Sequence, residues 1–159
     1  MFIQKIVGSL NFPLWWMVML LVFTFPAFAF ADLGGDESSI QADRAQMRAS
    51  VQVARGATYA VHELKTRSGH VVREYVLPSG TVFGIAWQGP SKPDMRQLLG
   101  THFDEYMQAA EQMQRHGHGP LVVELPSLVV VSAGHIGVFS GRAYLPQMLP
   151  DGVRSETIR

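Results

Sequence analysis

Three alternating runs of apolar and polar residues between positions 58 and 90 form the clearest pattern in the chain. Such runs are typical of strands, and two turn signals that end in glycine separate them, at residues 67–69 and 78–80. A three-residue loop with glycine in the left-handed region is a common way to join two antiparallel strands. The pattern therefore predicts a three-stranded antiparallel meander.

Charge selects the register of the first hairpin. A three-residue loop sets Glu63 opposite Arg73 and His62 opposite Glu74. A two-residue loop would instead set Glu63 opposite Glu74, and like charges directly opposite each other destabilise a strand pair. We therefore expect the three-residue loop.

A second loop of the same kind pairs Tyr75 with Phe83 and Val71 with Trp87. Side chains alternate across a strand, so the meander has two faces. The aromatic face carries one charge pair and consists of Tyr59, Val61, Glu63, Val71, Arg73, Tyr75, Phe83, Ile85 and Trp87. The smoother face consists of Ala60, His62, Leu64, Val72, Glu74, Val76, Val82, Gly84 and Ala86. Both faces are too apolar to stay in water, so each is covered or serves as a binding surface.

A long amphipathic helix is predicted at residues 94–116. Asp94 is an acidic residue at the predicted N-terminus, where the helix dipole is positive. Gly117 is typical of the residue that follows the last turn of a helix. Gly100 is a weak point inside it. Apolar residues recur at steps of three and four, namely Met95, Leu98, Leu99, Phe103, Tyr106, Met107, Ala110 and Met113. This stripe is the natural cover for the smoother face of the meander.

The remaining elements complete an α+β domain. A short helix begins at Ser38 or Ser39, and an edge strand covers residues 50–55. Further strands are expected at 121–125, 128–132 and 136–144, with a hairpin tip at Ala133-Gly134. The prediction is an antiparallel sheet of about six strands packed on the long helix, in one domain of residues 32–153. Residues 154–159 are predicted as a loose tail.

The first 31 residues have the pattern of a cleavable signal peptide. Lys5 is followed by an apolar run from Leu14 to Phe25, and small-x-small cleavage signals end at Ala29 and Ala31. The run is short for a membrane span, which needs ~20 apolar residues. We expect export to the periplasm or the medium, with membrane contact only through the signal peptide. An uncleaved segment that tethers an envelope protein is the alternative.

Charge and composition exclude some partners. The full chain has 13 basic and 13 acidic residues, and removing residues 1–31 removes Lys5 only, which leaves a net charge of −1. This balance predicts no binding to nucleic acid. The chain has no cysteine, so its stability must come from packing rather than disulfides.

No catalytic, metal or cofactor motif is present. His116 and His118 flank one glycine but have no third ligand nearby, so we expect no metal site. His62 opposite Glu74 is a possible acid–base pair, and also an ordinary cross-strand polar pair. No G-x-S-x-G elbow or phosphate-binding glycine loop occurs, and we assign no catalytic residue and no cofactor.

Three segments resemble a known family of small exported bacterial proteins. They read V-H-E-L-x-T-x-S-G-x-V-V-R-E-Y-V-x-P-S-G-x-V-F-G-I-A-W-Q-G-P, P-D-M-R-Q-L-L-G and G-H-I-G-V-F-S-G-R-A-Y-L-P-Q-M-L-P-x-G-V. The chain is similar to the family called domain of unknown function 2844 over residues 33–153. This resemblance implies a signal peptide and one domain, and it implies no established activity or catalytic residue.

These observations favour a non-catalytic binding module that uses the aromatic face. The binding residues would be Tyr59, Glu63, Arg73, Tyr75, Phe83 and Trp87. The partner would be an envelope protein, a peptide or a surface component. The alternative is a small hydrolase or metal-dependent enzyme that uses His62, Glu74 and His135. A pocket around the histidine would favour that alternative.

Overall fold

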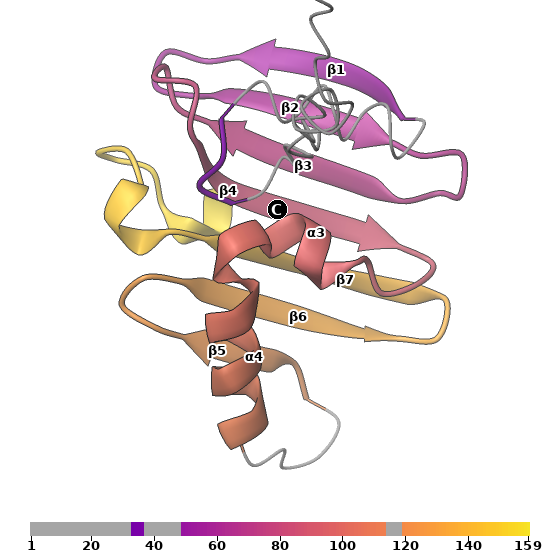
Figure 1. Ribbon diagram of the computed structural model, residues 1–159. Helices are drawn as coiled ribbons and strands as arrows, with labels where there is room; N and C mark the ends of the chain where they lie inside the picture. Colours follow the sequence, from indigo (N-terminus) through magenta and orange to yellow (C-terminus); the bar gives the residue numbers. More distant parts are fainter. Residues whose placement is uncertain (1–32, 37–48, 114–118) are drawn as a thin grey trace, which may run out of the picture.

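Seven strands form a single antiparallel sheet within residues 33–36, 49–113 and 119–159, which are the residues that the computed structural model describes. The order across the sheet is β1-β2-β3-β4-β7-β6-β5 (Figure 1). The strands are β1 Ser50–Arg55, β2 Ala60–Lys65, β3 Val71–Val76, β4 Val82–Gly89, β5 Leu121–Glu124, β6 Val129–His135 and β7 Val138–Tyr144. The predicted α+β class, the meander and the edge strand β1 are confirmed, and the sheet has seven strands rather than about six.

The β2–β3 hairpin has the register that charge predicted. Glu63 pairs with Arg73, and His62 pairs with Glu74. The loop is closed by a hydrogen bond from the Thr66 N–H to the His70 carbonyl at 2.9 Å. Gly69, with a φ of +86°, takes the left-handed position that the three-residue loop requires.

The β3–β4 hairpin departs from the predicted register. Val76 pairs with Val82, but Tyr75 pairs with Gly84, so Phe83 is an extra residue at a β-bulge. Beyond the bulge the pairing shifts by one residue, and a shift of one moves every side chain to the other face. Ile85 and Trp87 therefore lie on the opposite face from the predicted one. The predicted pairs of Tyr75 with Phe83 and of Val71 with Trp87 are wrong for this reason.

The β6–β7 hairpin also turns later than predicted. His135 pairs with Val138, which leaves Ile136-Gly137 as the tip in place of Ala133-Gly134. Gly137 has a φ of +90° and supplies the left-handed residue of the turn. Gly134 lies within β6 and pairs with Phe139.

The long helix is interrupted in its first half. It consists of α3 (Met95–Leu99), a 3₁₀ turn η1 (Gly100–His102) and α4 (Phe103–Gln112). Asp94 caps it as predicted, because its carboxylate accepts hydrogen bonds from the N–H groups of Arg96 and Gln97 at 2.9 and 3.3 Å. The break falls at Gly100, the predicted weak point, with a φ of +51°. The end predicted at residue 116 lies outside the described residues.

The helix covers one face of the sheet (Figure 1). We call this the helix face, and its core members include Leu64, Val72, Ile85 and Trp87 of the strands. Leu98 and Leu99 of α3 and Tyr106 of α4 are buried against it. The stripe is not buried along its whole length, because Met107 and Met113 are 36% and 38% exposed.

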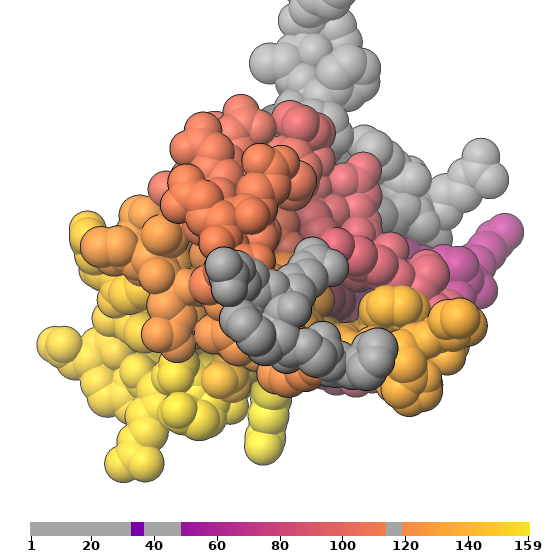
Figure 2. Space-filling model, turned by 90° about the horizontal axis from the view of Figure 1, so that it is seen from below, coloured from indigo at the N-terminus to yellow at the C-terminus, as the bar shows by residue number. Residues whose placement is uncertain are grey.

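The residues after β7 cover part of the opposite face, which we call the outer face. In place of the loose tail expected from residue 154, the chain forms the 3₁₀ turns η2 (Pro146–Met148) and η3 (Ser155–Thr157). Ile158 is fully buried beside Tyr75, Phe83 and Ala86. Figure 2 shows these yellow residues on the side of the strands away from the red and orange helices. We call residues 146–159 the C-terminal segment.

Residues 33–36 join the sheet beside β4. The Gly34 N–H donates to the Val82 carbonyl, and Leu33 is fully buried. The predicted signal peptide and short N-terminal helix lie outside the described residues. None of the helices in the described ranges has the length and apolar character needed to cross a bilayer.

Candidate functional site

Three of the predicted binding residues form an aromatic cluster on the outer face. The ring centroids of Tyr59 and Tyr75 are 5.9 Å apart, those of Tyr59 and Phe83 5.8 Å, and those of Tyr75 and Phe83 6.2 Å. These spacings are within the range of favourable tilted and edge-to-face contacts. Tyr75 and Phe83 are buried and Tyr59 is partly exposed.

Trp87 does not belong to this cluster. It lies on the helix face and is 4% exposed. The paired residue on β7 is Gly141, and a Cβ at that position would overlap the Trp87 ring. The missing side chain at 141 therefore makes the space that the indole fills.

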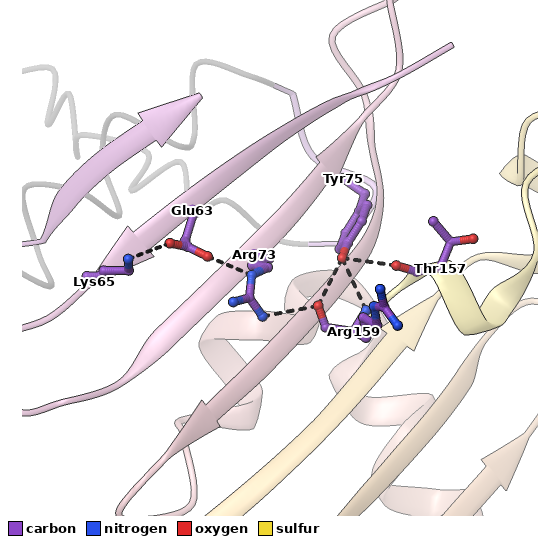
Figure 3. Close-up of polar contacts among 6 residues, drawn as sticks. All are labelled: Glu63, Lys65, Arg73, Tyr75, Thr157 and Arg159. Carbon is purple, nitrogen blue, oxygen red and sulfur yellow. Dashed lines mark hydrogen bonds and ion pairs between the residues drawn. The ribbon is translucent and has the colours of Figure 1, made fainter. Parts of the chain in front are cut away.

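A chain of charged side chains, Lys65, Glu63 and Arg73, lies on the same face as Tyr75 of the aromatic cluster (Figure 3). The Glu63 carboxylate binds Arg73 Nε at 2.7 Å through one oxygen and Lys65 Nζ at 2.8 Å through the other. The hydrogen bond from Lys65 and the adjacent Arg73 hold the pKa of Glu63 below its ordinary value, although partial burial opposes them. The pair Glu63–Arg73 was predicted, and Lys65 was not.

The C-terminal segment is held on this face through its main chain (Figure 3). An Arg73 Nη1–H donates to the Arg159 carbonyl at 3.1 Å. Tyr75 Oη accepts from the Arg159 N–H at 3.1 Å, and its hydrogen can reach the carbonyls of Thr157 and Arg159 at 3.3 and 3.1 Å. Between these contacts, Ile158 packs over Gly84, where a Cβ would come within 2.8 Å of the isoleucine Cδ1.

His62 and Glu74 are paired as predicted, but both are buried. Their exposed fractions are 4% and 0%, on the side of the sheet that the helix covers. His135 is exposed at the β6–β7 turn, five residues along β6 from Val130. Val130 lies in the same cross-strand row as His62 but four strands away, so His135 is displaced from His62 by roughly 16 Å along the strands and roughly 19 Å across them. The structure does not bring His135 to the pair, and the burial of the pair favours a structural role.

A second histidine–carboxylate contact joins the helix to the β5–β6 loop. His102 Nδ1 lies 2.6 Å from a Glu105 oxygen, and the Ser127 hydroxyl donates to the other oxygen at 3.0 Å. Here the carboxylate stands between the hydroxyl and the imidazole. Nucleophilic catalysis needs the imidazole next to the hydroxyl, so we interpret these contacts as structural, connecting the helix to the β5–β6 loop.

The imidazole of His70 has the opposite arrangement, with hydroxyls on both sides. Its Nδ1 lies 3.0 Å from Ser68 Oγ and its Nε2 lies 2.9 Å from Ser91 Oγ. The three residues line a cleft of about 280 Å³ between the β2–β3 turn and the start of α3. Thr66, Lys92 and Gln97 also line it.

The chain matches one protein family. The family described as "Protein of unknown function (DUF2844)" matches residues 29–158. The chain belongs to the DUF2844 family. No curated protein and no solved structure matches it. The family membership confirms the resemblance seen in the sequence motifs and assigns no function to any residue of this DUF2844 chain.

Within the described part of the DUF2844 chain, no group of three His, Cys, Asp or Glu side chains is placed to hold a metal ion. His116 and His118 lie outside the described residues. The His70 cleft was missed from the sequence because Ser91 is 21 residues away from His70. The predicted meander offered a partial signal, since pairing of the second and third strands along their length brings His70 close to the segment after residue 88.

Proposed function

We propose that this DUF2844 protein is an exported binding module whose outer face recognises a short peptide segment that carries an aliphatic side chain. The observation that supports this proposal is the way in which the face holds residues 157–159. Arg73 and Tyr75 bind main-chain atoms, while Ile158 fills the space above Gly84. Main-chain hydrogen bonds that supply affinity, and a pocket that supplies specificity, are the usual parts of peptide recognition.

Selectivity on this face comes from one side chain. Ile158 is fully buried, whereas Thr157 and Arg159 on either side are exposed. The side chains of the neighbours therefore contribute little, and the main-chain contacts accept any residue at those positions. A partner segment needs an aliphatic residue at the central position and a free carbonyl after it. The C-terminal segment fills the site in the free protein, and the partner's segment takes its place.

The charges beside the cluster keep the site in a binding geometry. Glu63 holds the guanidinium of Arg73 through Nε, which leaves Nη1 directed at the carbonyl of the bound segment. Arg73 is 32% exposed and Glu63 20%, so the pair is partly shielded from water. A partly buried, oriented donor loses less freedom when a segment binds, and this favours affinity.

The test is a chain that stops at Arg154, combined with a peptide of residues 154–159. We expect the shortened protein to remain folded and to bind the peptide with a dissociation constant between about 10 μM and 1 mM, as one buried anchor and a few hydrogen bonds allow. Titration calorimetry measures the affinity. The full-length protein should bind the same peptide far more weakly, because its own segment competes.

Matched control variants distinguish specific peptide recognition from nonspecific binding. Tyr75→Phe keeps the ring and removes the Oη hydrogen bonds to the main chain, so we expect about fivefold weaker peptide binding. The peptide with Ile158→Ala should not bind measurably. The proposal is wrong if the shortened protein unfolds, or if it stays folded but does not bind the peptide. In either case the buried cluster on the outer face serves only to stabilise the fold.

Export is part of this proposal and rests on the N-terminal pattern alone. Lys5, the apolar run from Leu14 to Phe25 and the alanines at 29 and 31 support it. The mass of the protein recovered from the cell envelope tests it. A mass that corresponds to a chain beginning after Ala29 or Ala31 supports export with cleavage. A mass that retains residues 1–31 supports the membrane-tethered alternative instead.

A further inference from the structure

The hydrogen bonds around His70 are compatible with a proton on its Nδ1. The Thr66 hydroxyl donates to the His70 carbonyl at 3.3 Å and accepts from the His70 N–H at 3.0 Å. A hydroxyl has a single hydrogen, so when Thr66 donates to the His70 carbonyl, the 2.9 Å contact between Thr66 Oγ1 and Ser68 Oγ uses the hydrogen of Ser68. Ser68 Oγ then accepts from His70 Nδ1 at 3.0 Å.

In this tautomer the other nitrogen, Nε2, is an acceptor. With the proton on Nδ1, Nε2 presents its lone pair to Ser91 Oγ at 2.9 Å, and the Ser91 hydroxyl donates to it. This is the orientation in which an imidazole can remove a proton from a serine. The ring is also fixed in position, because it lies against the backbone of Gly89, where a Cβ would overlap it.

We propose that Ser91 is a nucleophile activated by His70, with Ser68 and Thr66 as positioning residues. A nucleophile, a base within hydrogen-bond reach and a third group that orients the base are the parts that covalent catalysis requires. The pair faces a cleft of about 280 Å³, just below the usual size range of ligand pockets, so only a small carboxylic ester fits it. Lys92 lines the same cleft, and its positive charge favours a carbonyl oxygen that becomes negative.

The reaction balances with water as the only co-reactant. Ser91 Oγ attacks the ester carbonyl carbon while its proton moves to His70 Nε2. The bond from that carbon to the alcohol oxygen breaks, and the alcohol leaves with the proton from Nε2. Water then attacks the acyl-serine, its proton passes through Nε2 to Ser91 Oγ, and the carboxylic acid is released.

A fluorophosphonate probe tests the nucleophile on the full-length protein. Ser79 is the control serine, because it is exposed like Ser91 and its hydroxyl donates to Thr81 rather than contacting an imidazole. Peptide mapping by mass spectrometry should show Ser91 labelled at least about tenfold faster than Ser79. His70→Gln should slow labelling of Ser91 by about 100-fold, the usual contribution of a general base. Equal labelling of the two serines would overturn the proposal.

Hydrolysis of p-nitrophenyl acetate tests the positioning residue. Ser91→Ala should remove the protein-dependent rate, and Ser68→Ala should lower it about tenfold. Ser68→Thr keeps a hydroxyl and should retain the rate, and Ser79→Ala should change nothing. A rate that survives Ser91→Ala, or that is unaffected by Ser68→Ala, contradicts the assignment. Because the cleft lies on the helix face, these outcomes do not depend on peptide binding at the outer face.

Discussion

The two faces of the sheet are covered in different ways. On the helix face, Leu64, Ile85, Leu98 and Leu99 are fully buried within one large core. On the outer face the buried cluster is small, and Ile158 belongs to a segment that reaches it from the end of the described chain. A glycine makes room for a large side chain on each face. Gly141 leaves space for Trp87 of the neighbouring strand, whereas Gly84 leaves space for Ile158 of the C-terminal segment. The helix face is therefore covered by a helix from the middle of the chain, and the outer face by a short segment from residues 146–159.

The largest effect should come from the helix face. Leu64→Ala removes a fully buried side chain and leaves a cavity, so we expect a loss of about 3–5 kcal/mol in the free energy of unfolding. Urea denaturation followed by circular dichroism measures the loss. A loss below about 1 kcal/mol would mean that this core is loosely packed, and the contrast between the faces would disappear.

Ile158→Ala should cost less, about 2 kcal/mol, although Ile158 is equally buried. The reason is that the C-terminal segment can detach without opening the rest of the sheet, so part of the cost is avoided by local undocking. The same urea experiment checks it. If Ile158→Ala destabilises as much as Leu64→Ala, the segment is an inseparable part of the core.

The next effect concerns the start of α3. Asp94→Ala removes the cap that binds two N–H groups, and we expect a loss of about 1 kcal/mol. Asp94→Asn, which keeps a capping oxygen, is the matched control and should cost only a few tenths of that. Thermal and urea denaturation of both variants measure the difference, and an equal cost for the two would exclude capping as its cause.

The smallest effect is expected from the charges on the outer face. Glu63→Gln should cost about 0.5 kcal/mol at neutral pH, the usual range for partly exposed ion pairs. The pKa of Glu63 is lowered in the folded protein, so its contribution is present above the unfolded value of 4.5 and disappears as pH falls through the folded value. Wild type and Glu63→Gln should therefore become equally stable once the pH is below the folded value. A difference in stability that persists there would contradict this assignment.

Sequence reasoning predicted what depends on local pairing. The β2–β3 register follows from Glu63 and Arg73, because only one loop length sets opposite charges together. The β3–β4 register could not be predicted in the same way. The extra residue, Phe83, is as apolar as its neighbours, so nothing in the pattern marks the bulge that moves Trp87 to the helix face.

Contacts between distant segments were also beyond the sequence pattern. Ile158 is a single apolar residue among polar ones, a pattern typical of a loose tail, and its burial depends on the space above Gly84. Likewise, Ser91 reaches His70 only because β3 and β4 pair along their length. Charge and alternation predict neighbours on adjacent strands, whereas both of these contacts depend on the folded positions of loops.

Hydrogen exchange in the native protein tests most directly whether the outer face can release its occupant. The Arg159 N–H is bound to Tyr75 Oη, and the Ile158 N–H to the Ser155 carbonyl, whereas the Ile85 N–H lies in the middle of the sheet. If the C-terminal segment undocks locally, the amides of Ile158 and Arg159 should exchange at least about 100-fold faster than the amide of Ile85. In the Ile158→Ala variant, the exchange rate of the Ile85 amide should stay unchanged. Exchange of all three at the rate of global unfolding would contradict the account.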